Sequence, residues 1–256
     1  MNRFLLNVIH YTRRATRDYL EIFLIFIIPL GLIIVNGAIF LGDGVMFEGY
    51  NVAMSNFAPA FMLSFQFFSG GTMLLLLFKD LKGEMRNRLG AAPCSKHSFL
   101  APAFFANWLY SIFNAVLLIV VTSLFLNVYW GNLLILALVL GLVSLIAILI
   151  FAIVFLLAKT YSTANGLVYA ISFGMMFLSG WLLVPIGGNP VGDFLLQYTP
   201  LSLGVNAVVA SGMMSGFGFF GDAGGIGQSW INIAILAGIA LVLGLAAVIT
   251  ARRRKI

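Results

Sequence analysis

The stretch NLLILALVLGLVSLIAILIFAIVFLLA, residues 132–158, decides the fold class, because it contains no charged side chain anywhere along its length. An α-helix rises about 1.5 Å per residue, so about 20 consecutive apolar residues cross a hydrocarbon core of roughly 30 Å. Residues 132–158 exceed that length. We therefore expect this stretch to be a transmembrane helix.

The rest of the chain has the same character. Of its 256 residues, 62% are hydrophobic, and 14 basic and 8 acidic residues together make up 9%. Soluble domains carry roughly 25% charged residues, so this chain lacks the polar side chains that a surface in water requires. The net charge of +6 would suggest nucleic-acid binding only on a water-soluble domain with a basic face. The composition indicates an integral membrane protein with no nucleic-acid partner.

Six apolar stretches are long enough to cross a bilayer. They lie at about residues 22–41, 57–78, 103–126, 132–158, 164–184 and 229–250. Charged residues occur only at their edges, as with Lys79 after the second stretch and Lys159 after the fourth. No small-residue cleavage site follows the first stretch, so we expect a retained span there rather than a signal peptide.

The distribution of charge predicts the orientation of the spans. Lys and Arg in short loops stay on the cytoplasmic side of a membrane, and all 14 basic residues fall on one side of a six-span arrangement. The loops on the other side carry only acidic residues, namely Asp43, Glu48, Asp193 and Asp222. We expect a multi-pass protein of a bacterial-type cell membrane with both termini in the cytoplasm.

Residues that would carry other chemistry are missing from the sequence. Cys94 is the only cysteine, and no group of Cys and His residues has metal-ligand spacing. Neither an ATP-binding Gly-x-x-x-x-Gly-Lys-Ser/Thr segment nor an intramembrane protease motif occurs. The spans also lack the ionisable residues that ion-coupled carriers use. We expect no enzyme activity, no metal and no cofactor in this chain.

Residues 1–20 precede the first span and are amphipathic. Phe4, Leu5, Val8 and Ile9 recur at helical spacing, while the basic residues lie mostly elsewhere around the helix. Such a helix lies in the membrane interface, with its basic side chains near anionic lipid headgroups. The alternative is a short basic tail that only orients the first span.

The cytoplasmic segment 79–97 mixes charges of both signs with a narrow apolar stripe. Leu81, Met85 and Leu89 follow one another at intervals of four residues, which is typical of a short amphipathic helix, and Pro93 should end it. A topology signal needs no acidic residues, so the mixture suggests a surface that docks on another protein. The alternative is a solvated loop with ion pairs within the helix.

Residues 185–228 form a long outer segment between the fifth and sixth spans. Residues 193–209 are too short, and too interrupted by Pro200, to cross the membrane twice, yet they are apolar enough to dip into it. Such backbone is tolerated at membrane depth where protein or a cavity surrounds it. We expect a re-entrant segment here, followed by a glycine-rich linker.

The order of these features resembles the membrane subunits of ABC-2 type exporters. Residues 80–95 follow the pattern Asp-x-Lys-x-Glu-x-x-x-Arg-Leu-x-Ala-x-Pro-x-Ser, after an amphipathic start, a span, an outer loop and a second span. The match continues through Phe-Leu-Ser-Gly at 177–180, Tyr-Thr-Pro-Leu-Ser at 198–202 and basic residues after the last span. One departure is that the usual acidic and Gly-Thr pattern before Arg-Leu is blurred at 83–86, which leaves open which acid docks.

The resemblance implies a single all-α membrane domain over residues 1–256, with six transmembrane helices, an N-terminal interfacial helix and a pair of short re-entrant outer helices. It also implies a second permease copy or homologue as partner, and two ABC ATPase subunits that would bind ATP and Mg²⁺. Residues 79–97 would then be the coupling segment. Its contacts to the ATPase would come from Asp80, Lys82, Glu84, Arg86, Arg88, Leu89 and Pro93.

Polar residues within the spans form stripes at alternating steps of three and four, which place each set on one helix face. The second span carries Ser55, Pro59, Met62, Gln66, Ser69 and Met73, the fifth carries Asn165, Tyr169, Ser172, Met176 and Ser179, and the third carries Asn107, Ser111 and Asn114. We expect a cargo path, or the seam with a second permease, to be lined by Met62, Gln66, Ser69, Ser172, Met176 and Ser179. The alternative is that these side chains only join helices through hydrogen bonds.

The sequence therefore predicts the permease subunit of an ATP-driven exporter. A path lined by Ser, Met, Asn and aromatic side chains without charges suits an amphiphilic or hydrophobic cargo, such as a drug, a lipid-like molecule or a hydrophobic peptide. The alternatives are a non-ABC membrane transporter or channel, and an accessory membrane scaffold protein.

Overall fold

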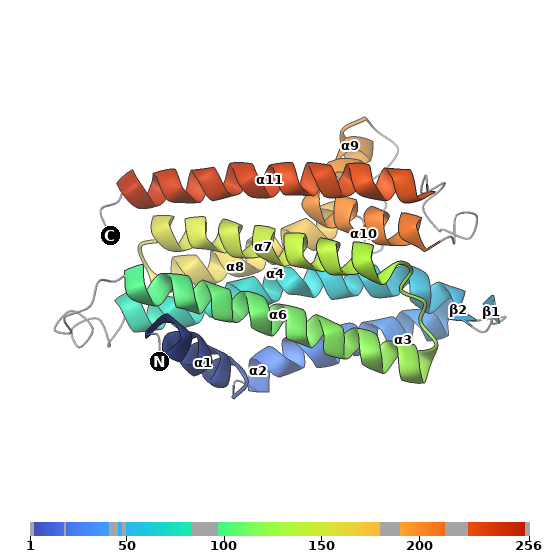
Figure 1. Cartoon of the computed structure of the whole chain (residues 1–256), viewed down its shortest axis with the longest axis horizontal. Helices are drawn as coiled ribbons and strands as arrows, with labels where there is room; N and C mark the ends of the chain where they lie inside the picture. Colours follow the sequence, from blue (N-terminus) through green and yellow to red (C-terminus); the bar gives the residue numbers. More distant parts are fainter. Residues whose placement is uncertain are drawn as a thin grey trace.

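The computed structural model describes residues 3–17, 19–40, 46–47, 50–82, 97–179, 190–212 and 225–253. Nearly all of these residues are helical, and the long helices run side by side along one axis (Figure 1). Both termini lie at one end of this bundle, called here the termini end. Two short strands lie at the opposite end, called here the hairpin end.

The chain begins with a set of short elements. They are α1 (Arg3–Ala15), α2 (Tyr19–Ile22), the π-helical turn η1 (Phe23–Ile27), α3 (Ile28–Phe40) and the antiparallel strands β1 (Met46–Phe47) and β2 (Tyr50–Asn51). The remaining elements are α4 (Val52–Lys82), α6 (His97–Leu126), α7 (Leu133–Leu157), α8 (Tyr161–Leu178), α9 (Pro190–Tyr198), α10 (Pro200–Ser211) and α11 (Gly225–Arg253).

Four described helices are long and apolar enough to cross a membrane, namely α4, α6, α7 and α11. The pair α9–α10, bent by 66°, raises this to five if it counts as one span. These helices confirm an all-α, multi-pass membrane protein. The four long helices coincide with the second, third, fourth and sixth expected spans. The first expected span corresponds to a shorter apolar helix over Phe23–Ile39, and the fifth corresponds to α8.

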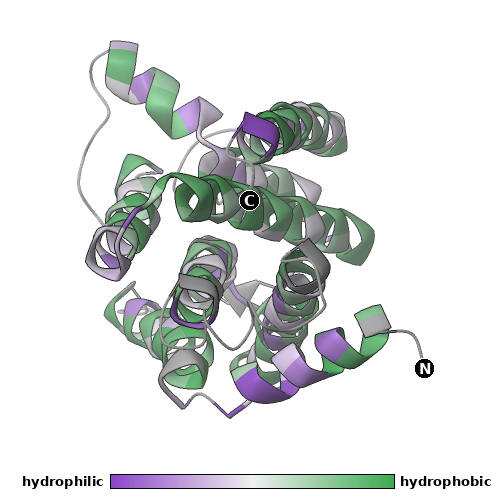
Figure 2. Ribbon diagram, turned by 90° about the vertical axis from the view of Figure 1, so that its left-hand side faces the viewer, coloured by the Kyte–Doolittle hydropathy of each residue, from purple (hydrophilic) through white to green (hydrophobic). Residues whose placement is uncertain are grey.

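The amphipathic helix expected in residues 1–20 is present as α1. Seen from the termini end, α1 alternates hydrophilic and hydrophobic residues, whereas the long helices are mostly hydrophobic (Figure 2). Val8 and Tyr11 of α1 are buried against the bundle, while Phe4, Leu5 and Ile9 are exposed. One apolar face of α1 therefore packs on the protein, and a second apolar surface is left uncovered.

α4 is the centre of the bundle, where it packs against α3, α6, α7, α8 and α10. Every residue from Met54 to Gly71 is buried. An apolar core at the hairpin end includes Ile33 of α3, Phe61 and Leu63 of α4, Leu118 of α6, Val139 of α7, Val205 of α10 and Leu236 of α11. A second core at the termini end includes Val8 and Tyr11 of α1, Leu74 and Leu77 of α4, Ala103 of α6, Phe155 of α7 and Val168 of α8.

α11 lies at the edge of the bundle, against α7 and α10. Its outer face is apolar and exposed, with Leu241, Val242, Leu245, Val248 and Ile249. α10 reaches the interior because Gly204 has no side chain. A Cβ atom there would lie 3.0 Å from Val143 Cγ2 and 3.2 Å from Leu63 Cδ1, so glycine lets α10 pack directly on α4 and α7.

Candidate functional site

Two groups of functional residues were expected, the coupling residues and the path residues, and the structure describes only the second group completely. Most of the expected coupling residues, namely Glu84, Arg86, Arg88, Leu89 and Pro93, lie outside the described residues. Lys82 is the last residue of α4, and Asp80 lies two residues before it. The expected path residues are all described.

Asp80 is held inside the chain. Arg14 of α1 donates a hydrogen bond from its guanidinium to Asp80 Oδ2 over 2.7 Å, and Asp80 is 8% exposed. The Asp80 carboxylate therefore contacts α1 instead of lying open at a docking surface. This ion pair joins helices whose residues are far apart in sequence, and it attaches α1 to the end of α4.

Tyr11 of α1 lies beside this ion pair. Its ring is buried in the core at the termini end, together with Leu74 and Leu77 of α4. Burial and the nearby Asp80 carboxylate raise the pKa of Tyr11 to about 12, and Arg14 opposes the shift. Tyr11 is therefore a neutral phenol at every physiological pH, and it seals the contact between α1 and α4.

The same end of α4 is also attached to α8. The Lys79 ammonium lies 5.4 Å from the centre of the Tyr161 ring, which is within the range of a cation–π contact. Phe78 packs edge-on against both Tyr161 and Phe155 of α7, with ring centres 6.4 and 5.9 Å away. The last described turns of α4 thus contact α1, α7 and α8 directly before the segment 83–96.

The expected path residues are all inside the bundle. Their exposed fractions do not exceed 5% in any case, for Met62, Gln66, Ser69, Ser172, Met176 and Ser179. A seam with a second permease requires side chains that one chain leaves uncovered, and here the chain's own helices cover them. This arrangement favours an internal path or helix packing over a seam. Tyr169, expected on the same face of the fifth span, is instead 42% exposed.

Some buried polar groups of the bundle have no hydrogen-bond partner among the described residues. They include the hydroxyls of the path residues Ser69 and Ser172, and also both amide atoms of Asn107 and Oδ1 of Asn36. Leaving a buried donor or acceptor unpaired costs about 1–3 kcal/mol. By contrast, Ser64 and Ser144 donate to the carbonyl groups of Ala60 and Leu140. The unpaired groups are therefore not an inevitable result of burying a serine in a helix.

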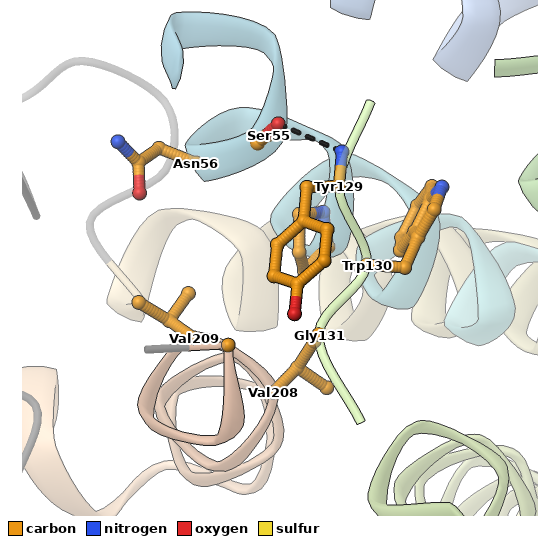
Figure 3. Close-up of a pocket in the computed structure, with 9 residues that line it drawn as sticks. Ser55, Asn56, Tyr129, Trp130, Gly131, Val208 and Val209 are labelled. Carbon is orange, nitrogen blue, oxygen red and sulfur yellow. Dashed lines mark hydrogen bonds between the residues drawn. The ribbon is translucent and has the colours of Figure 1, made fainter. Parts of the chain in front are cut away.

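At the hairpin end, α4, α10 and the loop 127–132 surround a small hollow (Figure 3). Ser55 Oγ accepts a hydrogen bond of 2.9 Å from the backbone N–H of Tyr129, which fixes the loop on the start of α4. The hollow encloses only about 10 Å³ and is lined by Ser55, Asn56, Pro59, Tyr129, Trp130, Gly131, Val208, Val209 and Gly212. Sites for drug-sized ligands measure roughly 300–1,000 Å³, so this hollow is a junction between elements rather than a cargo site.

Gly131 makes this junction tight. Its φ of +68° is in the left-handed region, and a Cβ atom there would lie 2.9 Å from both Ser211 Oγ and Gly212 Cα. Only glycine satisfies both conditions without strain. The loop before α7 is therefore pressed against the end of α10.

Comparison with known proteins provides no identity, because the chain matches no protein-family model and no curated protein matches it.

Sequence reasoning missed three residues of this arrangement. Arg14 was expected to set the topology and to lie near lipid headgroups, whereas Tyr11 and Tyr161 were not singled out. One signal was available, because Asp80 is an acid among bases at the end of an apolar helix, where it needs a cation. Nothing in the sequence indicates that the cation is 66 residues away.

Proposed function

We propose that this chain is the membrane-spanning permease subunit of an ATP-driven ABC exporter of the ABC-2 type. It would work with two separate ATPase subunits and a second permease, in a cell membrane with both termini cytoplasmic. The observation that carries the proposal is the attachment of α4 to α1 and α8 directly before the charged segment 83–96. A segment that receives force from a partner needs such attachments to pass it on.

The proposal includes six spans. α2, η1 and α3 follow one another without a break from Tyr19 to Phe40, because the residue that ends η1 is itself helical. That run is about 33 Å long at about 1.5 Å per residue, enough to cross a bilayer. α8, with 18 residues, supplies the remaining span. The bent pair α9–α10 serves as the re-entrant segment, since α10 is surrounded by protein as backbone at membrane depth must be.

In the proposed mechanism, ATP closes the two partner subunits and displaces the segment 83–96. Arg14–Asp80 carries the displacement to α1, and Lys79–Tyr161 carries it to α8. Each ATP state would bind a different packing of these helices more tightly, and that differential affinity shifts the population. The buried and uncharged path residues on α4 and α8 favour an amphiphilic or hydrophobic cargo.

The test is a charge reversal in the segment that would dock the ATPase. The double variant Glu84→Lys/Arg88→Glu should lose copurification of the ATPase and cargo export, because several charges in one docking patch decide orientation. The folded chain should persist, since charges on a docking surface contribute only about 0–1 kcal/mol to stability.

The matched control is Arg252→Glu/Arg253→Glu, which reverses two exposed charges at the same end of the bundle on α11. It should leave copurification intact. Normal ATPase copurification and normal export in Glu84→Lys/Arg88→Glu would contradict the proposal and favour a membrane protein that works without an ATPase.

A further inference from the structure

Four neutral polar side chains form a group between α4 and α6, called here the α4–α6 polar cluster. They are Gln66 and Ser69 of α4, which are 2% and 0% exposed, and Asn107 and Ser111 of α6, which are 2% and 1% exposed. Ser111 donates a hydrogen bond to Gln66 Oε1 and so sets the register of the two helices. All four lie within the stretches of α4 and α6 that are long and apolar enough to cross a membrane.

The two helices run in opposite directions, since α4 starts at the hairpin end and α6 finishes there (Figure 1). One turn from the Gln66–Ser111 contact toward the termini end therefore leads to Ser69 on α4 and to Asn107 on α6. The contact places Ser69 and Asn107 at the same depth in the bundle, one turn closer to the termini end than the Gln66–Ser111 pair.

Both helices carry polar atoms at that level without a partner in the described part of the chain. Among the described residues, the Ser69 hydroxyl and both amide atoms of Asn107 have no hydrogen-bond partner. Toward the hairpin end the situation differs. Gln66 bonds Ser111 one turn away, and Asn114, about two turns from Asn107, donates to the Tyr110 carbonyl over 2.9 Å. A serine within a helix usually bonds the carbonyl one turn before it, and Ser69 does not. An external partner would explain both groups.

We propose that the α4–α6 polar cluster is an internal binding site for a small neutral hydrogen-bonding group, supplied either by water or by the hydroxyl of a membrane-dissolved amphiphile. An amide and a hydroxyl together offer both donors and acceptors, which a neutral polar group satisfies and an apolar one does not. The cluster contains no charged side chain to balance an ion. Gln66 and Ser69 are also residues of the proposed path, but the site requires no ATPase and so does not depend on the proposed function.

Cysteine accessibility tests the site. In a Cys94→Ser background, which removes the only native cysteine, the variants Asn107→Cys and Ser69→Cys are treated with N-ethylmaleimide. The thiolate is the reactive form, and it needs a polar environment to ionise. The control is Ala115→Cys on the same helix, because Ala115 is equally buried at 2% but belongs to the apolar core.

At least one of the two cluster cysteines should react at least about tenfold faster than the control. That ratio corresponds to a tenfold larger population of the accessible, ionised thiol. Rates equal to that of Ala115→Cys in both variants would overturn the proposal. Addition of 1-octanol, with octane as its apolar control, distinguishes the source. Protection by octanol alone assigns the site to a membrane-borne hydroxyl, and labelling that neither compound changes assigns it to water.

A second measurement does not depend on the reactivity of a new cysteine. Asn107→Leu keeps the size of the side chain but removes its polar atoms, so it lowers the melting temperature if a bound partner is lost. A dry cluster predicts the opposite result, because removing unpaired polar groups from an apolar interior raises stability. A higher melting temperature for Asn107→Leu would therefore also overturn the proposal.

Discussion

α4 and α11 have nearly the same length, 31 and 29 residues, and both are long and apolar enough to cross a membrane. Their places in the bundle are opposite. In the most apolar window of each helix, 82% of α4 is buried but only 17% of α11, although α11 is the more hydrophobic of the two. In water the more hydrophobic helix would be expected inside.

The difference shows what selects the interior of a membrane protein. Lipid tails are as apolar as Leu, so burying a Leu from lipid yields little, while polar and small side chains benefit from helix contacts. α4 carries Ser64, Gln66, Gly70 and Gly71 in its middle, whereas the second half of α11 carries mainly aliphatic residues. The helix that lipid suits least is therefore the one that the protein surrounds.

Truncation of a leucine should separate the two helices most clearly. Leu77 of α4 is fully buried and Leu245 of α11 is 65% exposed. Leu77→Ala should destabilise the chain by about 2 kcal/mol, the lower end of the range for buried leucines, because the cavity remains costly although burial from lipid contributes little. Leu245→Ala should change stability by less than about 0.5 kcal/mol, as at other exposed sites. Thermal unfolding of the purified chain measures both, and equal losses would show that α4 is not the centre.

Charged side chains at the termini ends of the two helices should also contribute differently to stability, by less free energy than the leucines do. Asp80 of α4 is paired with Arg14, whereas Arg252 and Arg253 of α11 are exposed. A double-mutant cycle with Arg14→Ala and Asp80→Ala should give a coupling of about 1 kcal/mol, a modest value because the Arg14 side chain is 41% exposed to screening. The matched cycle with Arg13→Ala, an exposed neighbour on α1, should be additive. Coupling in both cycles would mean that a general field, and not the contact, joins α1 to α4.

The smallest expected effect concerns pH and tests how well α1 seals the end of α4. The pKa of Tyr11 is raised from 10 to about 12 in the folded chain. Above pH 10 the unfolded chain ionises this phenol while the folded chain does not, so stability is complete below pH 10 and falls between about pH 10 and 12. In a titration of phenolate absorbance, Tyr11→Phe should remove a component at the alkaline end. Loss of a component near pH 10 instead would mean that α1 leaves Tyr11 in water.

Hydropathy was sufficient to predict four of the spans, because a run such as Leu133–Leu157 has no alternative environment. Two helix starts also carry capping residues that the sequence-based predictions did not use. Asn132 caps α7 by accepting from the backbone N–H of Leu134 over 2.9 Å, and Thr160 caps α8 in the same way through Thr163. The stripe on α4 was identifiable from its spacing, since alternating steps of three and four place residues on one face.

The neighbours of each helix could not be predicted, because hydropathy describes a helix and its solvent but not its partners. Nothing in the spacing of Gln66 indicates Ser111 rather than Ser172, and nothing near Asp80 indicates Arg14. The π-helical turn Phe23–Ile27 was missed as well, since it consists of the same apolar residues as the helix around it. These features depend on tertiary packing, which overrides local preference.

The central position of α4 has a consequence for the order of synthesis. α4 ends at Lys82, and α8, which covers part of it, ends at Leu178. Ribosomes add about 5–20 residues per second, so roughly a hundred residues take about 5–20 s. During that interval the newly made α4 lacks the α7, α8 and α10 contacts that later enclose Ser64 and its neighbours. α4 is therefore made well before the helices that enclose it, and its surroundings are complete only when α10 has been made up to Ser211.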